Sequence, residues 1–213
     1  MKDYLADAIV LARKDVRLEL RARDTLPAML LFVVSTLVVF HFVLPADSSD
    51  LAATGLLWVA LLFTALLGLS RSFAAEREQG VIDGLVLAPS DRSAIWLGKT
   101  LSILAFLGLA ELIALPAYAL FFKPVDAALV GGVALADVGI AAVGTLLAAM
   151  ATASRARELL LPLLFLPLAI PIVIGGVGAS VAGQPGRYLG LLALYDALFA
   201  IICWASFEYV VTE

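Results

Sequence analysis

The sequence has few of the residues from which most catalytic, metal-binding and disulfide-bonded sites are built. It contains one cysteine and one histidine among 213 residues, and charged residues make up only 15% of it. A single cysteine excludes an intrachain disulfide. The lone histidine, with no HExxH sequence, excludes the common zinc-protease motif. The net charge of −4, without a basic patch interleaved with aromatic residues, argues against nucleic acid as a partner.

Apolar residues, in contrast, are abundant. They form 63% of the chain, whose mean hydropathy is +1.05, whereas soluble domains contain about 45–50% apolar residues. Runs of about 18 or more apolar residues recur, and each is long enough to cross a bilayer. We therefore expect an all-α integral membrane protein that forms a single domain over residues 1–213. The six predicted transmembrane helices are residues 26–44, 51–70, 94–122, 128–151, 158–181 and 188–211.

The first 24 residues predict an amphipathic helix rather than a span. Apolar residues recur there at spacings of three and four, while arginines and a lysine occupy the other faces. Such a helix lies in the headgroup plane with its apolar side towards lipid. An ordinary exposed helix is the alternative. The apolar positions are Leu5, Ile9, Ala12, Val16 and Leu20.

The distribution of lysine and arginine predicts the orientation of the spans. Twelve of the 14 basic residues lie in the amino-terminal segment, in or beside residues 71–99, or at residues 155–157. The other side of the membrane has only Lys123 and Arg187. Loops rich in Lys and Arg stay on the cytoplasmic side. Both termini and the segment of residues 71–93 are therefore expected in the cytoplasm.

The segment of residues 71–93 is longer and more apolar than a simple connection requires. Glu76 and Glu78 extend the preceding helix into water, and Gly80 allows a turn. A short helix with Asp83 on its polar side follows, and Pro89 ends it. Ser90 or Ser93 is then expected to cap the next helix. The short helix presents an apolar face formed by Val81, Ile82, Leu85 and Val86.

Two uses of this apolar face remain open from the residues alone. A short helix parallel to the membrane fits the groove of a cytoplasmic partner protein. It can equally rest on the lipid surface.

Three stretches of the sequence resemble a known family. "EREQGVIDGLVLAPSDRSAIWLGK" resembles the cytoplasmic loop of exporter-type ABC permeases, in which a charged, glycine-containing turn leads into a coupling helix. "DGLVLAPSDRSAIWLGK", together with "RKDVRLELRARDTLPAMLLF" and the terminal "FEYVVTE", resembles the CcmB family, the haem exporter B subunit of cytochrome c maturation. The resemblance covers nearly the whole chain.

The resemblance implies a fold, a location and a set of partners. The fold is that of an exporter-type ABC permease in the plasma (inner) membrane of a bacterium, with residues 1–23 as connecting helix and 81–87 as coupling helix. The partners are a cytoplasmic ABC ATPase subunit, a haem-handling membrane subunit, an outer-face haem chaperone and membrane lipid. This chain alone holds no cofactor; haem is a transported or handled ligand. The residues expected to dock on the ATPase are Glu76, Glu78, Gly80, Val81, Ile82, Asp83, Leu85, Val86, Pro89 and Arg92.

The sequence "LGKT", from Leu97 to Thr100, looks like the end of a phosphate-binding loop but fails two requirements. Ser93 stands where the loop needs its first glycine, and no strand precedes it. The chain is therefore expected to be a non-catalytic membrane subunit, with ATP bound and hydrolysed by a separate chain.

Three acidic residues, Glu111, Asp137 and Asp196, fall within predicted spans. Ionisable groups are costly there and usually face protein or a water-filled path. Helix lengths place all three in the outer half of the membrane, so we expect a subunit contact or a pathway where they converge or meet a neighbouring subunit. An intramembrane aspartyl protease is a remote alternative, based on Asp137 and Asp196. Its Gly-x-Gly-Asp motif is missing, and the two aspartates stand in reverse order.

Prolines interrupt the fifth predicted span at Pro162, Pro167 and Pro171. Each removes a backbone donor, so the helix is expected to kink or partly break. It would then serve as a gate or a re-entrant outer segment, or would simply be irregular to fit its neighbours. At the outer end of the first span, His41 is expected at the interface, with a haem-ligand role as the alternative.

Two other functions remain possible from the sequence. One is a permease of the same superfamily for another substrate, such as a lipid-linked glycan or a drug. The other is a membrane scaffold that transports nothing.

Overall fold

A computed structural model of the protein describes residues 2–45, 50–73, 91–152 and 157–212. These residues form helices and no strand, as expected where lipid leaves backbone groups no partner outside their own helix. Six helices are long and apolar enough to span a membrane, and their bounds differ from the predicted ones by at most three residues. The six-span, all-α prediction is confirmed. In order, the helices are α1 (Lys2–Ala22), α2 (Thr25–Val43), α3 (Asp50–Arg71), α6 (Arg92–Phe121), α7 (Ala127–Thr152), α8 (Arg157–Val181) and α9 (Pro185–Thr212).

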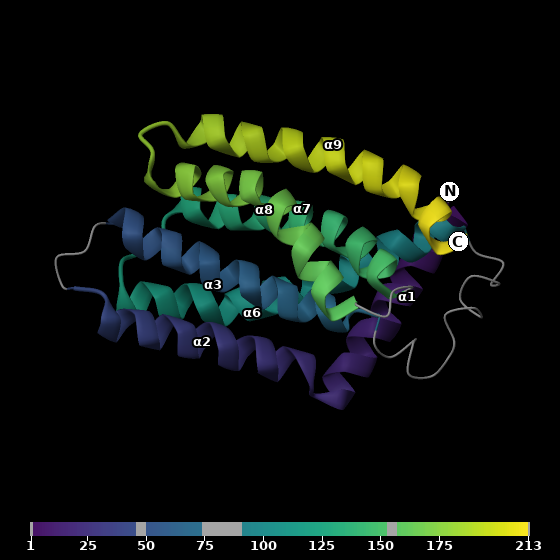
Figure 1. The fold of residues 1–213 in the computed structure, drawn as a ribbon, viewed down its shortest axis with the longest axis horizontal. Helices are drawn as coiled ribbons and strands as arrows, with labels where there is room; N and C mark the ends of the chain where they lie inside the picture. Colours follow the sequence, from purple (N-terminus) through teal and green to yellow (C-terminus); the bar gives the residue numbers. More distant parts are fainter. Residues whose placement is uncertain (1, 46–49, 74–90, 153–156, 213) are drawn as a thin grey trace.

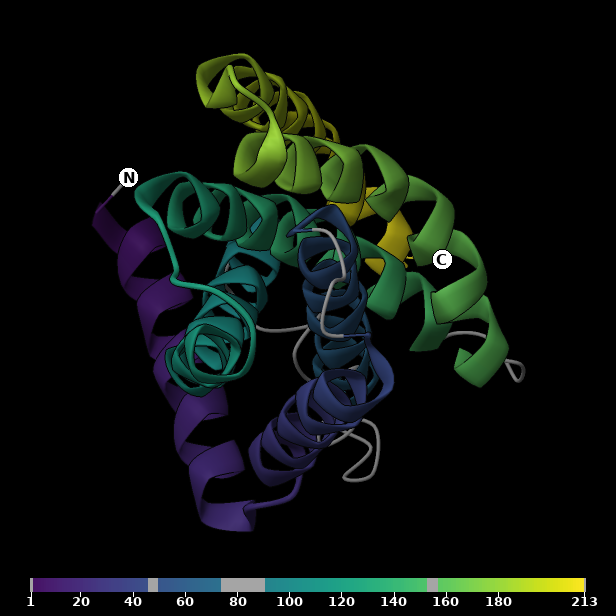
Figure 2. The same cartoon turned by 90° about the vertical axis from the view of Figure 1, so that its left-hand side faces the viewer.

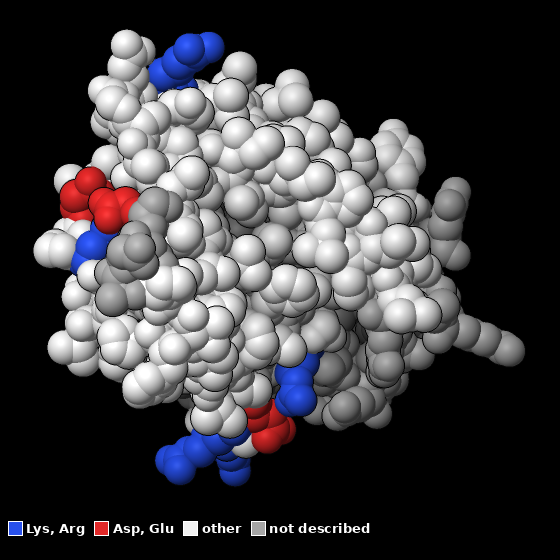
Figure 3. Space-filling view, turned by 60° about the vertical axis from the view of Figure 1, so that its left-hand side comes forward, with Lys and Arg blue, Asp and Glu red and all other residues white. Residues whose placement is uncertain are grey.

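The six long helices run side by side, and α1 crosses one end of the bundle at a steep angle (Figure 1). Both chain termini lie at that end. Figure 2, which views the bundle end-on, shows α1 along one flank and α9 along the top. Charged side chains gather at the margins of a broad uncharged surface in Figure 3. This is the distribution expected of a protein whose middle band contacts lipid.

Helix α7 is the centre of the bundle. In its most apolar stretch 72% of residues are buried, against 17% in α2 and in α9. Its sequence is rich in glycine and alanine, whose small side chains let neighbouring helices approach closely. Packing of this kind holds membrane helices together because lipid provides no hydrophobic drive for their association.

The amino-terminal helix forms as predicted, but the sequence did not indicate how it contacts the bundle. Ala8 is fully buried, and Leu11 packs against the core, so this face of α1 lies on α6. The predicted apolar face is largely left outside, with Leu5 and Ile9 each 50% exposed. Helix α1 therefore has a protein-facing side and a separate apolar side available to lipid.

The prolines of α8 do not divide it. Pro162, Pro167 and Pro171 all lie inside one continuous helix, which bends in Figure 1. Of the two expectations, a kink agrees with this bend, whereas a partial break, and with it a re-entrant segment, is wrong. A transmembrane helix can accommodate prolines without dividing. The Tyr195 hydroxyl of α9 also donates to the Leu168 carbonyl of α8 at 2.8 Å, which ties the two helices together.

A glycine of α8 makes room for the indole of Trp58. A Cβ at Gly176 would lie 2.2 Å from the ring of Trp58, a residue that is only 2% exposed. We expect Gly176→Ala to destabilise the purified protein by about 1–3 kcal/mol, because a buried indole cannot move aside freely. Thermal unfolding in detergent micelles measures this effect.

Gly190→Ala is the matched control, since Gly190 is also helical and has open space around its Cβ position. It should leave stability unchanged or slightly improved. Equal unfolding temperatures for the two variants would contradict the close contact between Gly176 and Trp58.

Candidate functional site

The predicted docking residues fall almost entirely outside the part of the chain that the structure describes. This holds for Glu76, Glu78, Gly80, Val81, Ile82, Asp83, Leu85, Val86 and Pro89. Their contact with an ATPase stays a prediction. The structure describes the residues on either side of this segment, which end at Phe73 and resume at Asp91. The geometry of these two ends determines what the segment is attached to.

Where the segment of residues 71–93 leads into α6, Asp91 caps the amino-terminal end of that helix. Asp91 accepts hydrogen bonds through Oδ1 from the Ser93 backbone N–H at 3.1 Å and from the Ser93 hydroxyl at 2.9 Å. The sequence had suggested Ser90 or Ser93 as the cap. Ser93 is instead the donor, and Asp91 occupies the capping position with extended backbone geometry.

The start of α6 also meets the last turns of α9. The Arg92 guanidinium lies 3.8 Å from the Glu208 carboxylate, although both side chains are substantially exposed. The Trp204 indole N–H donates to the Tyr4 hydroxyl at 3.2 Å. The first and last helices of the chain therefore meet around the start of α6. Arg92, the one described member of the predicted docking set, lies at this junction.

A buried lysine joins α1, α6 and the last residues before the segment. The Lys99 residue is 3% exposed. Its ammonium lies 3.0 Å from Asp15 of α1 and donates to the Ser72 carbonyl at 2.8 Å. The same nitrogen lies over the Phe73 ring, 4.8 Å from its centre. A buried ammonium needs paired charge and hydrogen-bond acceptors, and these partners supply both.

Asp15 has a second basic neighbour. The Lys14 ammonium lies 3.1 Å from its other carboxylate oxygen, but Lys14 is far more exposed than Lys99. We call Asp15, Ser72, Phe73 and Lys99 the lysine junction. The lysine junction connects helix α1 to both ends of the predicted coupling segment. At the first end, Lys99 contacts Asp15 of α1 as well as Ser72 and Phe73. At the second end, Lys99 belongs to α6, the helix that Asp91 caps.

Gly98 allows the two helices of this junction to touch. A Cβ at Gly98 would lie 2.9 Å from the Ala8 carbonyl oxygen and 2.8 Å from the Leu11 Cβ. The backbone of α1 is therefore in contact with α6 where Lys99 reaches Asp15. Both Gly98 and Lys99 lie within a helix, which agrees with the interpretation of "LGKT" as an accidental match to a phosphate-binding loop.

Two of the three intramembrane acids meet in the core. The side chains of Glu111 on α6 and Asp137 on α7 line the same small cavity, close enough to interact with each other. A hydrogen bond between them would require a proton on one of the two carboxyl groups. The adjoining cavity, which Trp58 also lines, has a volume of about 10 Å³ and is far too small for an organic ligand. In this conformation the pair is a contact between helices rather than the wall of a substrate path.

The third acid does not join them. Asp196 on α9 is 6% exposed and packs against Gly139 of α7, where a Cβ would lie 2.5 Å from its Oδ1. Gly139 and Asp137 are about 200° apart around α7, at 3.6 residues per turn. Convergence of all three acids is therefore wrong within this chain. Among the described residues, neither carboxylate oxygen of Asp196 has a hydrogen-bond partner.

This arrangement also removes the aspartyl-protease alternative. Such an enzyme needs two aspartates sharing a proton and a water molecule. Asp137 pairs with a glutamate, and Asp196 lies across α7 from it.

His41 lies in the last turn of α2, against the carboxyl end of α6. Its Nδ1 lies 2.9 Å from the Phe121 carbonyl oxygen, and three phenylalanine rings surround the imidazole. Within the described residues no group of three potential metal ligands forms around it or elsewhere. The interfacial interpretation of His41 agrees with this position.

Comparison with known proteins gives a consistent result over almost the whole chain. The family model described as CcmB protein matches residues 6–207. Three relatives are each called heme exporter protein B. The protein from Bradyrhizobium diazoefficiens is 30% identical, with 92% of this chain and 88% of the relative covered. The protein from Rhodobacter capsulatus is 33% identical, covering 92% and 94%, and that from Pseudomonas aeruginosa is 32% identical, covering 88% of each. The chain belongs to the CcmB family.

Proposed function

We propose that this chain is the membrane-spanning permease subunit of an ABC-type haem export system for cytochrome c maturation. The observation that carries the proposal is the match to proteins called heme exporter protein B along about nine-tenths of both chains. The six apolar spans support a permease. Haem is the cargo of this system, and the chain itself performs no chemical reaction on it.

The orientation follows from charge and from the position of α1. Twelve of 14 basic residues lie on one side of the proposed topology, which we assign to the cytoplasm. Helix α1 crosses the bundle at that end, where its exposed apolar face can lie in the headgroup layer. The membrane is the plasma (inner) membrane of a bacterium, with both termini in the cytoplasm.

The energy for transport comes from a separate ATPase chain that docks on residues 76–92. The lysine junction supports a coupling role for this segment. When the docked segment moves, it pulls on Ser72 at one end and on Asp91 at the other. Lys99 is hydrogen-bonded to Ser72, lies in the helix that Asp91 caps, and pairs with Asp15 of α1, so the movement reaches α1. The bundle and the crossing helix therefore respond together.

Two further partners belong to the proposal: a haem-handling membrane subunit and an outer-face haem chaperone. We assign Asp196 to a contact or pathway with the former, since a buried carboxylate is costly without a partner. Bending of α8 at Pro162, Pro167 and Pro171 provides the gate, because each proline removes one bond of the helix ladder.

Leu85→Glu tests the docking and thereby the function. A buried interfacial anchor typically contributes about 2 kcal/mol, so association with the ATPase should weaken roughly thirtyfold. The measurement is co-purification of the ATPase with the chain, combined with the yield of c-type cytochrome in cells that lack the native gene. We expect both to fall while the variant still inserts into the membrane.

Gln79→Glu adds the same charge within the same segment but lies outside the predicted apolar face, and it should leave both readouts unchanged. Normal ATPase association for Leu85→Glu would instead favour a helix that rests on lipid. Failure of the unaltered chain to restore cytochrome yield would reject the proposed function itself.

A further inference from the structure

A groove with a volume of about 620 Å³ lies on the bundle between α2, α3, α7 and α8. The first half of α2, the last turns of α3 and α7, and the first turns of α8 line it. Helix α2 begins directly after α1, so the groove lies towards the end of the bundle that α1 crosses. Phe63 is 42% exposed and Phe32 is partly exposed, so the groove opens to the surface of the bundle. Its volume lies within the range of about 300–1,000 Å³ that is usual for small-molecule sites.

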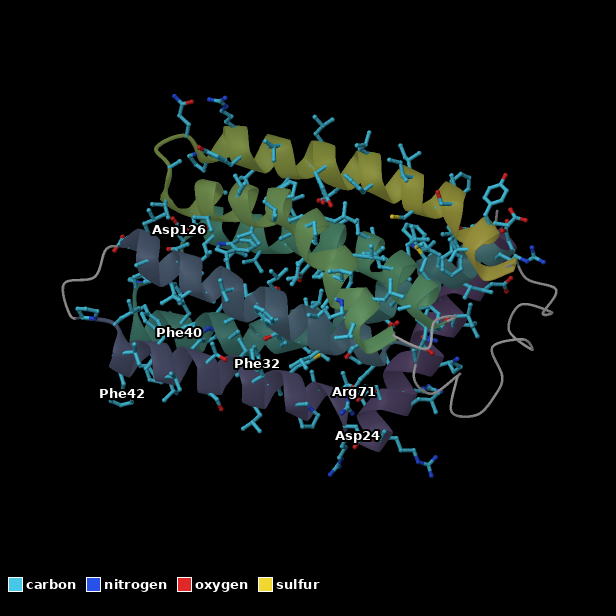
Figure 4. All side chains as sticks on the ribbon, in the orientation of Figure 1. Asp24, Phe32, Phe40, Phe42, Arg71 and Asp126 are labelled. Atoms are coloured by element: carbon cyan, nitrogen blue, oxygen red, sulfur yellow. The ribbon has the colours of Figure 1, made fainter. Side chains whose placement is uncertain are left out.

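The groove is amphipathic. Phe32, Phe63 and Phe73 contribute aromatic rings to its walls, whereas Ser70, Arg71 and Thr152 place polar groups at one end. The hydroxyls of Ser70 and Thr152 already donate to carbonyls of their own helices, at 2.8 and 2.6 Å. Figure 4 shows Arg71 beyond Phe32, towards the end of the bundle that α1 crosses.

Arg71 is the group that can bind a charged ligand here. Its side chain is exposed and forms no ion pair with any described residue. A guanidinium presents five donors in a fork that matches a carboxylate, and it stays charged at any physiological pH. The groove thus offers an aromatic, apolar body and one cation near the proposed cytoplasmic surface.

We propose that this groove binds haem from the cytoplasmic leaflet, with a propionate on Arg71 and the macrocycle among the phenylalanine rings. This inference rests on the proposed function, because it takes haem as the cargo. From Phe63 to Arg71 the groove follows eight residues of α3, or about 12 Å. That length suits a compact planar anion better than a two-chain lipid, which extends through about 15 Å of its leaflet.

The lining predicts how the ligand is recognised. None of the described residues that line the groove is a histidine, cysteine or methionine, so these residues offer the iron no ligand. Binding therefore depends on the carboxylates and the ring, not on the metal. Phe73 also belongs to the lysine junction, through Lys99 over its ring, so an occupied groove touches the element that holds α1.

The test uses the full chain in nanodiscs of neutral phosphatidylcholine, with protoporphyrin IX, haem and protoporphyrin dimethyl ester as probes. Fluorescence titration, or absorbance for haem, measures affinity. We expect haem and protoporphyrin IX to bind with similar affinity. Arg71→Gln should weaken both about tenfold or more, the effect of losing a charge-assisted hydrogen bond. Protoporphyrin dimethyl ester has no carboxylate for Arg71, so it should bind the unaltered chain about as weakly as protoporphyrin IX binds the Arg71→Gln variant. The affinity of the ester for Arg71→Gln should be no lower than its affinity for the unaltered chain.

Arg187→Gln removes a basic residue from the first turn of α9, outside the groove, and should leave binding unchanged. Leu67→Trp, which adds bulk to the groove wall, should abolish binding, whereas Val59→Trp on the same helix outside the groove should not. Both positions are exposed on α3, at 37% and 42%, so each variant is expected to fold.

Several results would overturn the proposal: equal affinity of acid and ester, full affinity of Arg71→Gln, or haem binding that iron-free porphyrin cannot match. Displacement of porphyrin by phosphatidylglycerol at the ratios found in membranes would make the groove a lipid site. Cytochrome yield separates this inference from the function. If Arg71→Gln loses porphyrin binding but matures cytochromes normally, the groove is not on the path, while the proposed function stands.

Discussion

Lys99→Met is expected to release α1 from the bundle. Methionine keeps the length of the side chain but removes the ammonium, so buried Asp15 keeps only the more exposed Lys14 as its partner. Removing one member of a buried ion pair typically costs about 3–5 kcal/mol. We expect the free energy of unfolding to fall by about 3 kcal/mol, measured by tryptophan fluorescence during unfolding in mixed micelles.

The double variant Lys99→Met/Asp15→Asn distinguishes a paired charge from simple loss of packing. With both charges gone, no unpaired ion remains, so much of the stability should return. If the double variant is as unstable as the sum of the two single variants, the ion pair contributes no coupling energy. Arg187→Gln, at an exposed position in the first turn of α9, controls for the removal of positive charge alone.

Glu111→Leu is expected to damage the core and cytochrome maturation, whereas Glu111→Gln is tolerated. Glutamine keeps the shape of the side chain and a hydrogen-bonding group beside Asp137. Leucine leaves the buried Asp137 carboxyl without that partner, at a cost of about 1–3 kcal/mol and more if the group is charged. Unfolding in detergent and the yield of c-type cytochrome measure the two effects.

Glu111→Leu/Asp137→Leu removes both partners and should recover part of the lost stability, because no buried polar group is then left unsatisfied. A Glu111→Leu variant with normal unfolding and normal cytochrome yield would show that the pair is dispensable. Full stability combined with low yield would instead place Glu111 on a pathway.

The spans could be predicted from sequence because each one is specified locally. A run of about 20 apolar residues is sufficient to cross the bilayer, and lipid forces such a run into a helix whatever its neighbours are. The spacing of apolar residues, which is also a local signal, predicted residues 1–24 as an amphipathic helix. Local sequence also rejected "LGKT" as a phosphate-binding loop, since the residues that follow Ser93 continue as apolar helix.

The choice of contacts could not be predicted in this way. A helix that is apolar on every side carries no signal for which face meets protein. The sequence therefore indicated that Glu111, Asp137 and Asp196 lie at similar depth but not that α7 separates Asp196 from the other two. Depth follows from position along a helix, whereas rotation about its axis is set by packing against neighbours.

The lysine junction shows the same difference between features that one segment specifies and features that depend on packing. The sequence by itself determined the six spans and the amphipathic first helix of this protein, because hydrophobic length and periodicity act within one segment. Only the tertiary structure decided that Lys99 pairs with Asp15 and that Gly98 lies against the backbone of Ala8. These residues are more than 80 positions apart. Their meeting depends on how α1 crosses α6, which is a property of the packed bundle and of no single segment.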